Sequence, residues 1–314
     1  MLCTKKHRGI RKRGATTFIQ RLLDAIGNFF REMLVQGITN NLQPAFDAFA
    51  ARLDNSTALL QQTPQTYNAG MFNMVMGLAQ NVMMPIAVVI LTAILTYDLI
   101  YTLENKNSMD EFDFYHIQLW LVKVVVALLF LGNSIQIINV IFTLGVVAVT
   151  GAAELLNAEI AANPIDDVIY YITYHTTNED LGALAGLFLM SWLVRLIMLV
   201  VELVIHWAIL SRFFIIYIKM TAAPIPLATM INHEWRHVGN NYLKTIMAVS
   251  FQGFFMIAII ALYYVALLTA TNIEGGIDMS NIWNALGLPI LYSIIVVTLL
   301  LKTESISKSI FGAM

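Results

Sequence analysis

Leu181–Ile218 reads LGALAGLFLMSWLVRLIMLVVELVIHWAILSRFFIIYI, and its Lys, Arg, Asp and Glu residues are Arg195, Glu202 and Arg212 alone. A helix needs about 20 apolar residues to cross the hydrocarbon core of a bilayer, and this stretch exceeds that length. The whole chain has the same character. Of its 314 residues, 58% are hydrophobic and 12% are charged, and its mean hydropathy is +0.71. Because soluble globular proteins are far more polar, the sequence predicts a polytopic membrane protein.

Four further apolar stretches complete the prediction of an all-α membrane protein with about five transmembrane helices, some of them long. Three have ordinary lengths: Met74–Leu103, Leu243–Leu268 and Ile282–Leu301. Phe114–Ala153 is different, because its roughly 40 residues would form a helix of roughly 60 Å, twice the hydrocarbon thickness. It is either one long helix that projects from the membrane or a hairpin that turns at Gly132–Ser134. The hairpin would give six crossings.

The region before the first span carries a basic leader and an amphipathic helical tail. Lys and Arg crowd into Met1–Gly14, and in Phe18–Leu34 apolar residues recur on one arc of a helix, opposite polar ones. Such a helix can lie in a lipid interface, or pack the same face against the membrane bundle or a partner protein. Asn55–Asn73 is typical of a polar connector. The predicted divisions are residues 1–70, a transmembrane domain at 71–303 and a cytoplasmic C-terminal tail at 304–314.

The positions of the cations orient the chain in the cell membrane. Four of them surround one loop: Arg212, Lys219, Arg236 and Lys244. The loops 154–180 and 271–282 contain no Lys or Arg. Because cytoplasmic loops carry the excess of cations, this bias predicts a cytoplasmic C-terminus. Five crossings then place the N-terminus outside the cell, whereas six place it inside. No cation lies between Arg52 and the first span, and this favours five.

Polar side chains within the stretch 181–218 share one helix face, within about 60° at helical spacing. They are Ser191, Arg195, Glu202 and His206. Glu202 and His206 are four residues apart and can pair directly. A charge at membrane depth costs roughly 2.5 kcal/mol or more, so this stripe must face protein or water. It is either the polar lining of a conduit or a salt-bridged seam between helices, with Lys123 as a further partner. Gly182 and Gly186 have the spacing that allows close helix packing.

One motif suggests zinc chemistry. His233-Glu-Trp-Arg-His237 matches the H-E-x-x-H pattern, which on a helix places two imidazoles on one side and Glu234 near a metal-bound water. However, Pro224 and Pro226 lie just upstream and disfavour a regular helix through the motif. The nearest downstream acids lie in a loop predicted across the membrane. We therefore expect no metal, no cofactor and no catalysis, with a membrane zinc metalloprotease as an alternative.

The bulk composition excludes other classes of function. The net charge of −2 gives no global basis for nucleic-acid binding, which would need local basic patches. The single cysteine, Cys3, excludes an internal disulfide and a cysteine-based metal cluster. The sequence also lacks a Walker-type phosphate-binding loop, so we expect the chain not to power transport by itself.

Several stretches together resemble a known family. They are Thr63-Pro-Gln-Thr-Tyr-Asn-Ala-Gly-Met-Phe-Asn73, Leu95-Thr-Tyr-Asp-Leu99, Ala222-Ala-Pro-Ile-Pro-Leu-Ala-Thr-Met230, Glu234-Trp235, Asn241-Tyr-Leu243, Phe251-Gln-Gly-Phe254 and Lys302-Thr-Glu-Ser-Ile-Ser-Lys-Ser-Ile-Phe311. The chain from about Phe29 onward resembles the TrbL-like polytopic membrane subunit of conjugative type IV secretion systems, in the branch found on mobile elements of Gram-positive bacteria. The basic leader Met1–Gly14 is not part of that resemblance.

The resemblance implies a non-catalytic part of a membrane channel or its platform, which helps to move single-stranded DNA with its attached relaxase. The implied partners are the system ATPases, small bitopic membrane subunits, membrane lipid and an oligomeric assembly within a larger complex. The candidate cytoplasmic docking residues are Arg212, Lys219, Pro224, Pro226, Glu234, Trp235, Arg236 and Lys244. A secondary transporter that uses the intramembrane charges is the alternative from another class. Against it, the sequence has no inverted repeat.

Overall fold

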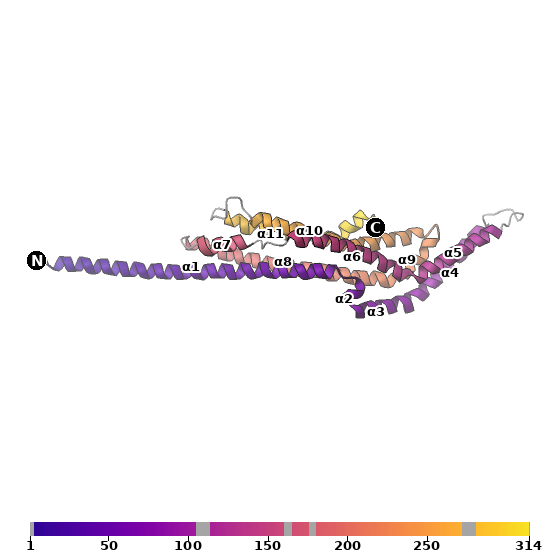
Figure 1. Ribbon diagram of the computed structural model, residues 1–314, viewed down its shortest axis with the longest axis horizontal. Helices are drawn as coiled ribbons and strands as arrows, with labels where there is room; N and C mark the ends of the chain where they lie inside the picture. The colour runs from indigo at the N-terminus through magenta and orange to yellow at the C-terminus, as the bar shows by residue number, and fades with distance from the viewer. Residues whose placement is uncertain (1–2, 105–113, 160–164, 176–179, 272–280, 314) are drawn as a thin grey trace. The chain divides into compact units, whose positions relative to one another are not determined.

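The structure is a computed structural model that describes residues 3–104, 114–159, 165–175, 180–271 and 281–313. Figure 1 shows that these residues form helices joined by short connections. The helices are α1 (Cys3–Leu60), α2 (Pro64–Tyr67), α3 (Ala69–Leu78), α4 (Met84–Glu104), α5 (Phe114–Gly132), α6 (Ser134–Glu159), α7 (Asp166–His175), α8 (Leu181–Ala222), α9 (Pro224–Ala228), α10 (Arg236–Thr271) and α11 (Ile282–Ile310). A π-helical turn, Ala79–Met83, joins α3 to α4, and a 3-10 turn, Thr229–Ile231, follows α9.

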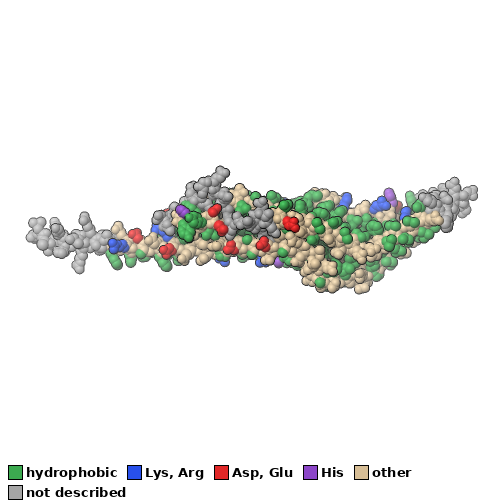
Figure 2. Space-filling model, viewed as in Figure 1, with side chains coloured by type: hydrophobic (Ala, Val, Ile, Leu, Met, Phe, Trp, Pro, Cys, Tyr) green, Lys and Arg blue, Asp and Glu red, His purple; other side chains and the backbone are tan. Residues whose placement is uncertain are grey.

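Five helices of the described chain are long and apolar enough to cross a membrane, which confirms the predicted all-helical polytopic fold. Their apolar parts are Ala69–Tyr101, Ser134–Leu155, Leu181–Ala222, Arg236–Ala270 and Ile282–Ile310. A further apolar helix, Ile117–Gly132, is shorter. Hydrophobic side chains cover much of the visible surface of the described helices (Figure 2). This distribution is what contact with lipid requires.

The long stretch Phe114–Ala153 continues as a helix through its polar interruption. Asn133, between α5 and α6, donates its backbone N–H to Leu129 O at 3.1 Å, and Ile137 N–H donates to Asn133 O at 3.0 Å. Both are the four-residue hydrogen bonds of an α-helix. The Asn133 side-chain amide also donates to Leu129 O, at 2.8 Å. The tight hairpin at Gly132–Ser134 is therefore not what the structure contains, because a reversal would break these bonds.

The N-terminal helix is longer than the amphipathic segment predicted. α1 continues through Pro44 to Leu60, so the first residues of the expected connector at Asn55–Asn73 are helical. The remainder of that connector holds α2, which begins with a capping box between Thr63 and Thr66. Most of the expected connector is therefore ordered helix.

The chain forms two compact units. Unit 1 comprises Met1–Arg52, Ile160–Glu202 and Leu262–Val296, and unit 2 comprises Leu53–Glu159, Leu203–Ala261 and Val297–Met314. The boundaries fall within α1, α8, α10 and α11, because these helices are long enough to contribute to both units. The division of the sequence at residues 70 and 303 stays a prediction.

Tyr263 is the centre of the packing in unit 1. Its ring meets that of Phe49 of α1 edge-on, with centroids 5.4 Å apart. Its hydroxyl lies 2.6 Å from Ser293 Oγ on α11 and 3.6 Å from Met198 Sδ on α8. One buried tyrosine therefore joins α10 to three other helices, and the ordinary cost of burying a hydroxyl is offset by its partners.

Two sets of helix–helix contacts hold unit 2 together. Small and branched residues let α4, α5 and α9 approach closely, and Trp120 Nε1 of α5 donates to Leu95 O of α4 at 3.2 Å. The core of this contact consists of Ala87, Leu91, Leu95, Ala127, Leu131 and Ala228. A second set of contacts joins α10 to α11. The helix α4 lies beside α5, and both meet α9 (Figure 1).

The segment 304–314, predicted as a tail, is largely the last part of α11 and is packed. Ser307 Oγ, fully buried, donates to Ala248 O of α10 at 2.5 Å, and the rings of Phe251 and Phe311 lie 5.3 Å apart. The helix ends at Ile310. Gly312, with a φ of 58° that suits glycine, and Ala313 then donate their backbone N–H groups to Ser309 O and Lys308 O, which forms a Schellman cap.

Candidate functional site

The polar stripe of α8 meets α1 in unit 1. Ser191 is fully buried, and Asn41 Nδ2 of α1 donates to its Oγ at 3.2 Å. Arg195 Nη1 in turn donates to Asn41 Oδ1, also at 3.2 Å. The Asn41 side-chain amide thus donates to Ser191 and accepts from Arg195, both on α8. Because an unpaired polar group inside a membrane protein is costly, these bonds specify how α1 and α8 face each other.

The charged members of the stripe also find partners outside α8. Glu202 Oε2 lies 3.9 Å from Arg52 Nε of α1, with 17% of the glutamate side chain and 45% of the arginine side chain exposed. Lys123 Nζ of α5 lies 3.2 Å from Asp98 Oδ2 of α4. His206 is half-buried. Arg195, Glu202 and Lys123 thus have three different partners, Asn41, Arg52 and Asp98.

Sequence reasoning missed the partners Asn41, Arg52 and Asp98. Asn41 and Arg52 lie in the region treated as a tail, where hydropathy is low, so no apolar run drew attention to them. Helical spacing says which residues share a face, but it does not say which other helix covers that face. The choice between a conduit lining and a seam therefore stays a prediction.

Arg212, one of the candidate docking residues, is buried in the structure. Its side chain is only 2% exposed. Nε donates to Val249 O at 3.3 Å and Nη2 donates to Ser250 O at 3.1 Å, both on α10. A Cβ on Gly253 would lie 2.9 Å from the guanidinium carbon, so the glycine makes room for the group. Arg212 therefore joins α8 to α10 within unit 2.

The helix α10 approaches α6 at the same level. Ser250 Oγ donates to Ile141 O at 2.7 Å, and a Cβ on Gly145 would overlap Ser250. This short segment of α10 therefore receives Arg212 from one helix and lies against the backbone of another. Sequence reasoning did not single out Gly145 or Gly253, although small residues at helix contacts are a recognisable signal.

The two glycines predicted for helix packing differ in their surroundings. A Cβ on Gly186 would lie 2.8 Å from the indole of Trp283 on α11, so this glycine allows a close contact within unit 1. A Cβ on Gly182 would meet Asp180 at 3.0 Å, just before the start of its own helix. Gly186 is thus placed at a helix contact, and Gly182 lies at the helix end.

The H-E-x-x-H motif does not lie on one helix, because α10 begins only at its fourth residue, Arg236. His233, Glu234 and Trp235 form a turn before α10, in which Asn232 Oδ1 accepts from Glu234 N at 2.8 Å. His237 Nδ1 lies 3.0 Å from Glu234 O. The described residues contain no group of three or more His, Cys, Asp or Glu side chains that could hold a metal ion. The geometry that gives the motif its zinc chemistry is therefore not formed here.

The same turn is the exposed part of the predicted docking surface. Glu234, Trp235, Arg236 and Lys244 are exposed, with half of the Trp235 side chain accessible. Lys219 is half-buried, and its carbonyl accepts from Tyr242 Oη at 2.5 Å. The four exposed side chains are therefore accessible to a partner, and Lys219 is accessible only in part.

The two prolines before the turn contribute to packing. Pro224 and Pro226 belong to α9, which follows α8 after the single residue Ala223. Pro224 is buried and Pro226 half-buried, and α9 packs against α4, α5 and α6. Proline is well placed at the first turn of a helix, where its missing N–H costs nothing. The prolines therefore belong to a packed helix that precedes the turn.

Family motif residues also hold α2 against α8. Tyr217 Oη donates to Pro64 O at 2.7 Å. The ring of Tyr67 stacks on Phe213, with centroids 3.9 Å apart and ring planes 6° from parallel. The Thr63–Asn73 motif therefore has a structural role in unit 2.

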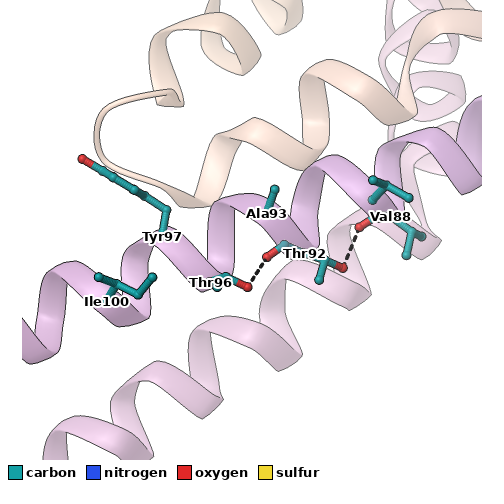
Figure 3. Close-up of a pocket in the computed structure, with 7 residues that line it drawn as sticks. Val88, Thr92, Ala93, Thr96, Tyr97 and Ile100 are labelled. Carbon is teal, nitrogen blue, oxygen red and sulfur yellow. Dashed lines mark hydrogen bonds between the residues drawn. The ribbon is translucent and has the colours of Figure 1, made fainter.

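A groove of about 600 Å³ lies along one side of α4 (Figure 3). Its lining residues are Val88, Val89, Thr92, Ala93, Thr96, Tyr97 and Ile100. The hydroxyls of Thr92 and Thr96 donate to the carbonyls of Val88 and Thr92, both at 2.8 Å. Because these hydroxyls are satisfied within their own helix, the groove offers an apolar surface to lipid.

Comparison with protein families identifies the chain. The sequence pattern of the family described as TrbL/VirB6 plasmid conjugal transfer like protein matches residues 50–224, which is more than half of the chain. The chain belongs to the TrbL/VirB6 family. Membership makes it a membrane component of a type IV secretion, or conjugative transfer, apparatus, and components of this family are generally non-catalytic. No curated protein and no solved structure matches the chain.

The TrbL/VirB6 match includes α2 to α8 and the last turns of α1, but not residues 1–49, α10 or α11. It therefore contains the Tyr217–Pro64 contact and the α8 residues Arg195 and Glu202, which contact α1. Asn41 lies outside the matched segment. The first part of α1 is consequently a feature of this chain that the family assignment does not explain.

Proposed function

We propose that this TrbL/VirB6-family protein is a non-catalytic part of the channel or platform in the cytoplasmic membrane of a conjugative type IV secretion system. In this role it helps to move single-stranded DNA with its attached relaxase. The observation that carries the proposal is the family match over residues 50–224, combined with five helices able to span a membrane. The resemblance noted above assigns it to the Gram-positive mobile-element branch.

The interior of unit 2 supports a role in conduction. Among the side chains of unit 2 that the structure describes, five buried atoms have no hydrogen-bond partner: Ser56 Oγ, Ser134 Oγ, Asn139 Oδ1, Arg212 Nη1 and Gln252 Oε1. Buried polar atoms are normally bonded to protein or to ordered water. A hydrophobic membrane bundle with this much free polar capacity is suited to admit water, which a translocation path for a charged polymer needs.

The exposed turn supports docking to a cytoplasmic partner such as a system ATPase. Trp235 and the next residue, Arg236, are exposed, as is Lys244 further along α10, and Trp and Arg are the residues most often found at the centres of protein interfaces. The proposed topology places this turn and the C-terminus in the cytoplasm. Small bitopic subunits would meet the lipid-facing helices instead.

Deletion of the gene tests the proposed function. We expect conjugative DNA transfer to be lost and restored by the intact chain, with uptake of small solutes unchanged. Normal mating frequency in the deletion strain would contradict the proposal, and altered solute uptake would favour a transporter. For the docking surface, Trp235→Ala combined with Arg236→Glu should abolish co-purification with the ATPase, while Val238→Ala, also exposed, should leave it intact.

A further inference from the structure

Three lysines from three helices lie together at one end of unit 2. Lys219 is in the last turn of α8, Lys308 is in the last turn of α11, and Lys244 lies near the start of α10. Lys219 and Lys308 are close enough for their ammonium groups to repel each other. Lys244 Nζ lies 3.9 Å from the place of a Cβ on Gly312, in the cap that follows α11. We call the three lysines the lysine cluster.

Buried contacts hold the three helices together at this level. Tyr242 Oη of α10 donates to Lys219 O of α8 at 2.5 Å. Ser307 Oγ of α11 is fully buried and donates to Ala248 O of α10. Because these bonds fix the helix backbones, the lysines cannot relieve their repulsion by moving the helices apart. The lysine cluster is therefore a preorganised concentration of positive charge, and preorganisation lowers the cost of binding an anion.

The lysine cluster holds more positive than negative charge. Glu304 Oε1 lies 2.7 Å from Lys308 Nζ, and the same carboxylate attracts Lys219. Among the residues that the structure describes, no carboxylate forms an ion pair with Lys219 or Lys244. Three ammonium groups therefore share one carboxylate. Lys219 is also half-buried, and water screens a partly buried charge incompletely. A further anion would stabilise this arrangement.

Apolar side chains suited to lipid extend along the helices up to the lysine cluster. Ile218, next to Lys219 on α8, is 68% exposed, and Leu301 of α11 is 53% exposed. Leu301, Glu304 and Lys308 lie on one face of α11, because three and four residues separate them. This face therefore changes from apolar to charged over roughly 10 Å. The lysine cluster thus lies where the apolar surface of the helices ends, which is the level of lipid headgroups.

We propose that the lysine cluster binds the phosphate headgroup of an anionic phospholipid, whose acyl chains lie along the exposed apolar side chains of α8 and α11. The phosphate oxygens accept hydrogen bonds from the ammonium groups and supply the negative charge that Glu304 alone does not. Basic sites between transmembrane helices are suited to such headgroups. The proposed topology places this end of unit 2 at the cytoplasmic leaflet, whose anionic lipids attract Lys and Arg.

The surroundings favour a lipid over a soluble anion as the occupant. A soluble phosphate would contact the ammonium groups alone. A phospholipid also covers Ile218 and Leu301, and the burial of their exposed apolar surface adds to its affinity. One ligand therefore satisfies both the charge of the lysine cluster and the apolar side chains next to it. The site needs neither DNA nor another subunit, so it stands apart from the proposed function.

Lipid binding by the purified full chain tests the site. The protein in a zwitterionic detergent is titrated with phosphatidylglycerol, and native mass spectrometry measures how much lipid is retained. Lys219→Gln combined with Lys308→Gln should lower the affinity about fivefold or more, since each cation near the headgroups contributes about that factor. The control is Lys302→Gln, which removes an exposed cation roughly 120° around α11 from Lys308. It should bind the lipid as the unchanged protein does.

Glu304→Gln provides a test that does not depend on losing a contact. It should raise the affinity for phosphatidylglycerol about twofold or more, because the carboxylate no longer competes with the phosphate for the ammonium groups. Unchanged or lower affinity in this variant would overturn the proposal, and so would equal affinity in the double lysine variant and the unchanged protein.

Two further probes distinguish the sources of the ligand. Phosphatidylcholine, whose headgroup has no net charge, should bind at least about fivefold more weakly than phosphatidylglycerol. Inorganic phosphate at the same concentration should not displace the bound lipid. Equal binding of the two lipids would overturn the proposal, and displacement by inorganic phosphate would overturn it in favour of a soluble anion. None of these measurements involves DNA transfer, so their failure is distinguishable from failure of the proposed function, which the mating assay decides.

Discussion

Arg212 places a charged group inside a bundle of apolar helices, bonded to backbone carbonyls of α10. Lysine could not reproduce this contact, because the planar guanidinium donates from several nitrogens at fixed angles. The contact also depends on Gly253, which leaves space for the guanidinium. At the residue scale, the α8–α10 contact therefore depends on a large residue, Arg212, that fits against a small one, Gly253.

Gly253→Ala should destabilise the protein by about 1–3 kcal/mol, the usual cost of overpacking, because its methyl group would strike the Arg212 guanidinium. The control is Gly151→Ala, whose methyl group would meet nothing within 4 Å and which should be neutral or gain up to about 1 kcal/mol from helix propensity. Thermal unfolding midpoints in detergent measure both. Equal midpoints would show that Gly253 does not make room for Arg212.

The structure changes which charge swap should restore function. Glu202 lies beside Arg52, whereas Arg195 bonds Asn41. Glu202→Arg alone should therefore reduce mating frequency, because it would place two cations together at this contact. Arg52→Glu added to it should partly restore the mating frequency, and the swap of Arg195 with Glu202 should not. Rescue by the second swap instead of the first would show that the pairing with α1 is incorrect.

At the scale of elements, the junction of α5 and α6 illustrates how a polar interruption can mislead. Gly, Asn and Ser in succession favour a turn. However, the backbone bonds of Asn133 continue the helix. The positive φ that a tight turn often requires is found, among the described glycines, at Gly312 instead.

Gly132→Ala should consequently leave stability unchanged or raise it by up to about 1 kcal/mol, because alanine has the higher helix propensity and its methyl group meets nothing within 4 Å. Gly312→Ala is the contrasting variant. It should cost about 1–2 kcal/mol, since φ is positive there. Midpoints of thermal unfolding and expression levels check both. Strong destabilisation by Gly132→Ala would restore the hairpin and six crossings.

At the scale of the molecule, topology follows from cation placement and from the direction of α1. In unit 1, α1 runs parallel to α8, so its N-terminal end is on the side where α8 begins. With the five apolar segments of the described chain as the crossings, a cytoplasmic C-terminus predicts an N-terminus outside the cell.

Cys3 should therefore react with a membrane-impermeant maleimide in intact cells, because five crossings and a cytoplasmic C-terminus place the N-terminus outside. The control is Ala313→Cys in a Cys3→Ser background, which should be protected until the cells are permeabilised. Protection of Cys3 with normal labelling after permeabilisation would require an even number of crossings.

The sequence by itself determined the membrane class, the helical fold, the main apolar helices and the family. These depend on local quantities, namely the length and hydropathy of single segments and the motifs within them. The tertiary structure alone decided that Arg212 is buried, that Asn41 and Arg52 of α1 are the partners of the α8 stripe, and that α5 continues into α6. The physical reason is that a polar group at membrane depth is stabilised only by what lies opposite it. Residues more than 100 positions away supply those partners, and no periodicity within one segment encodes them.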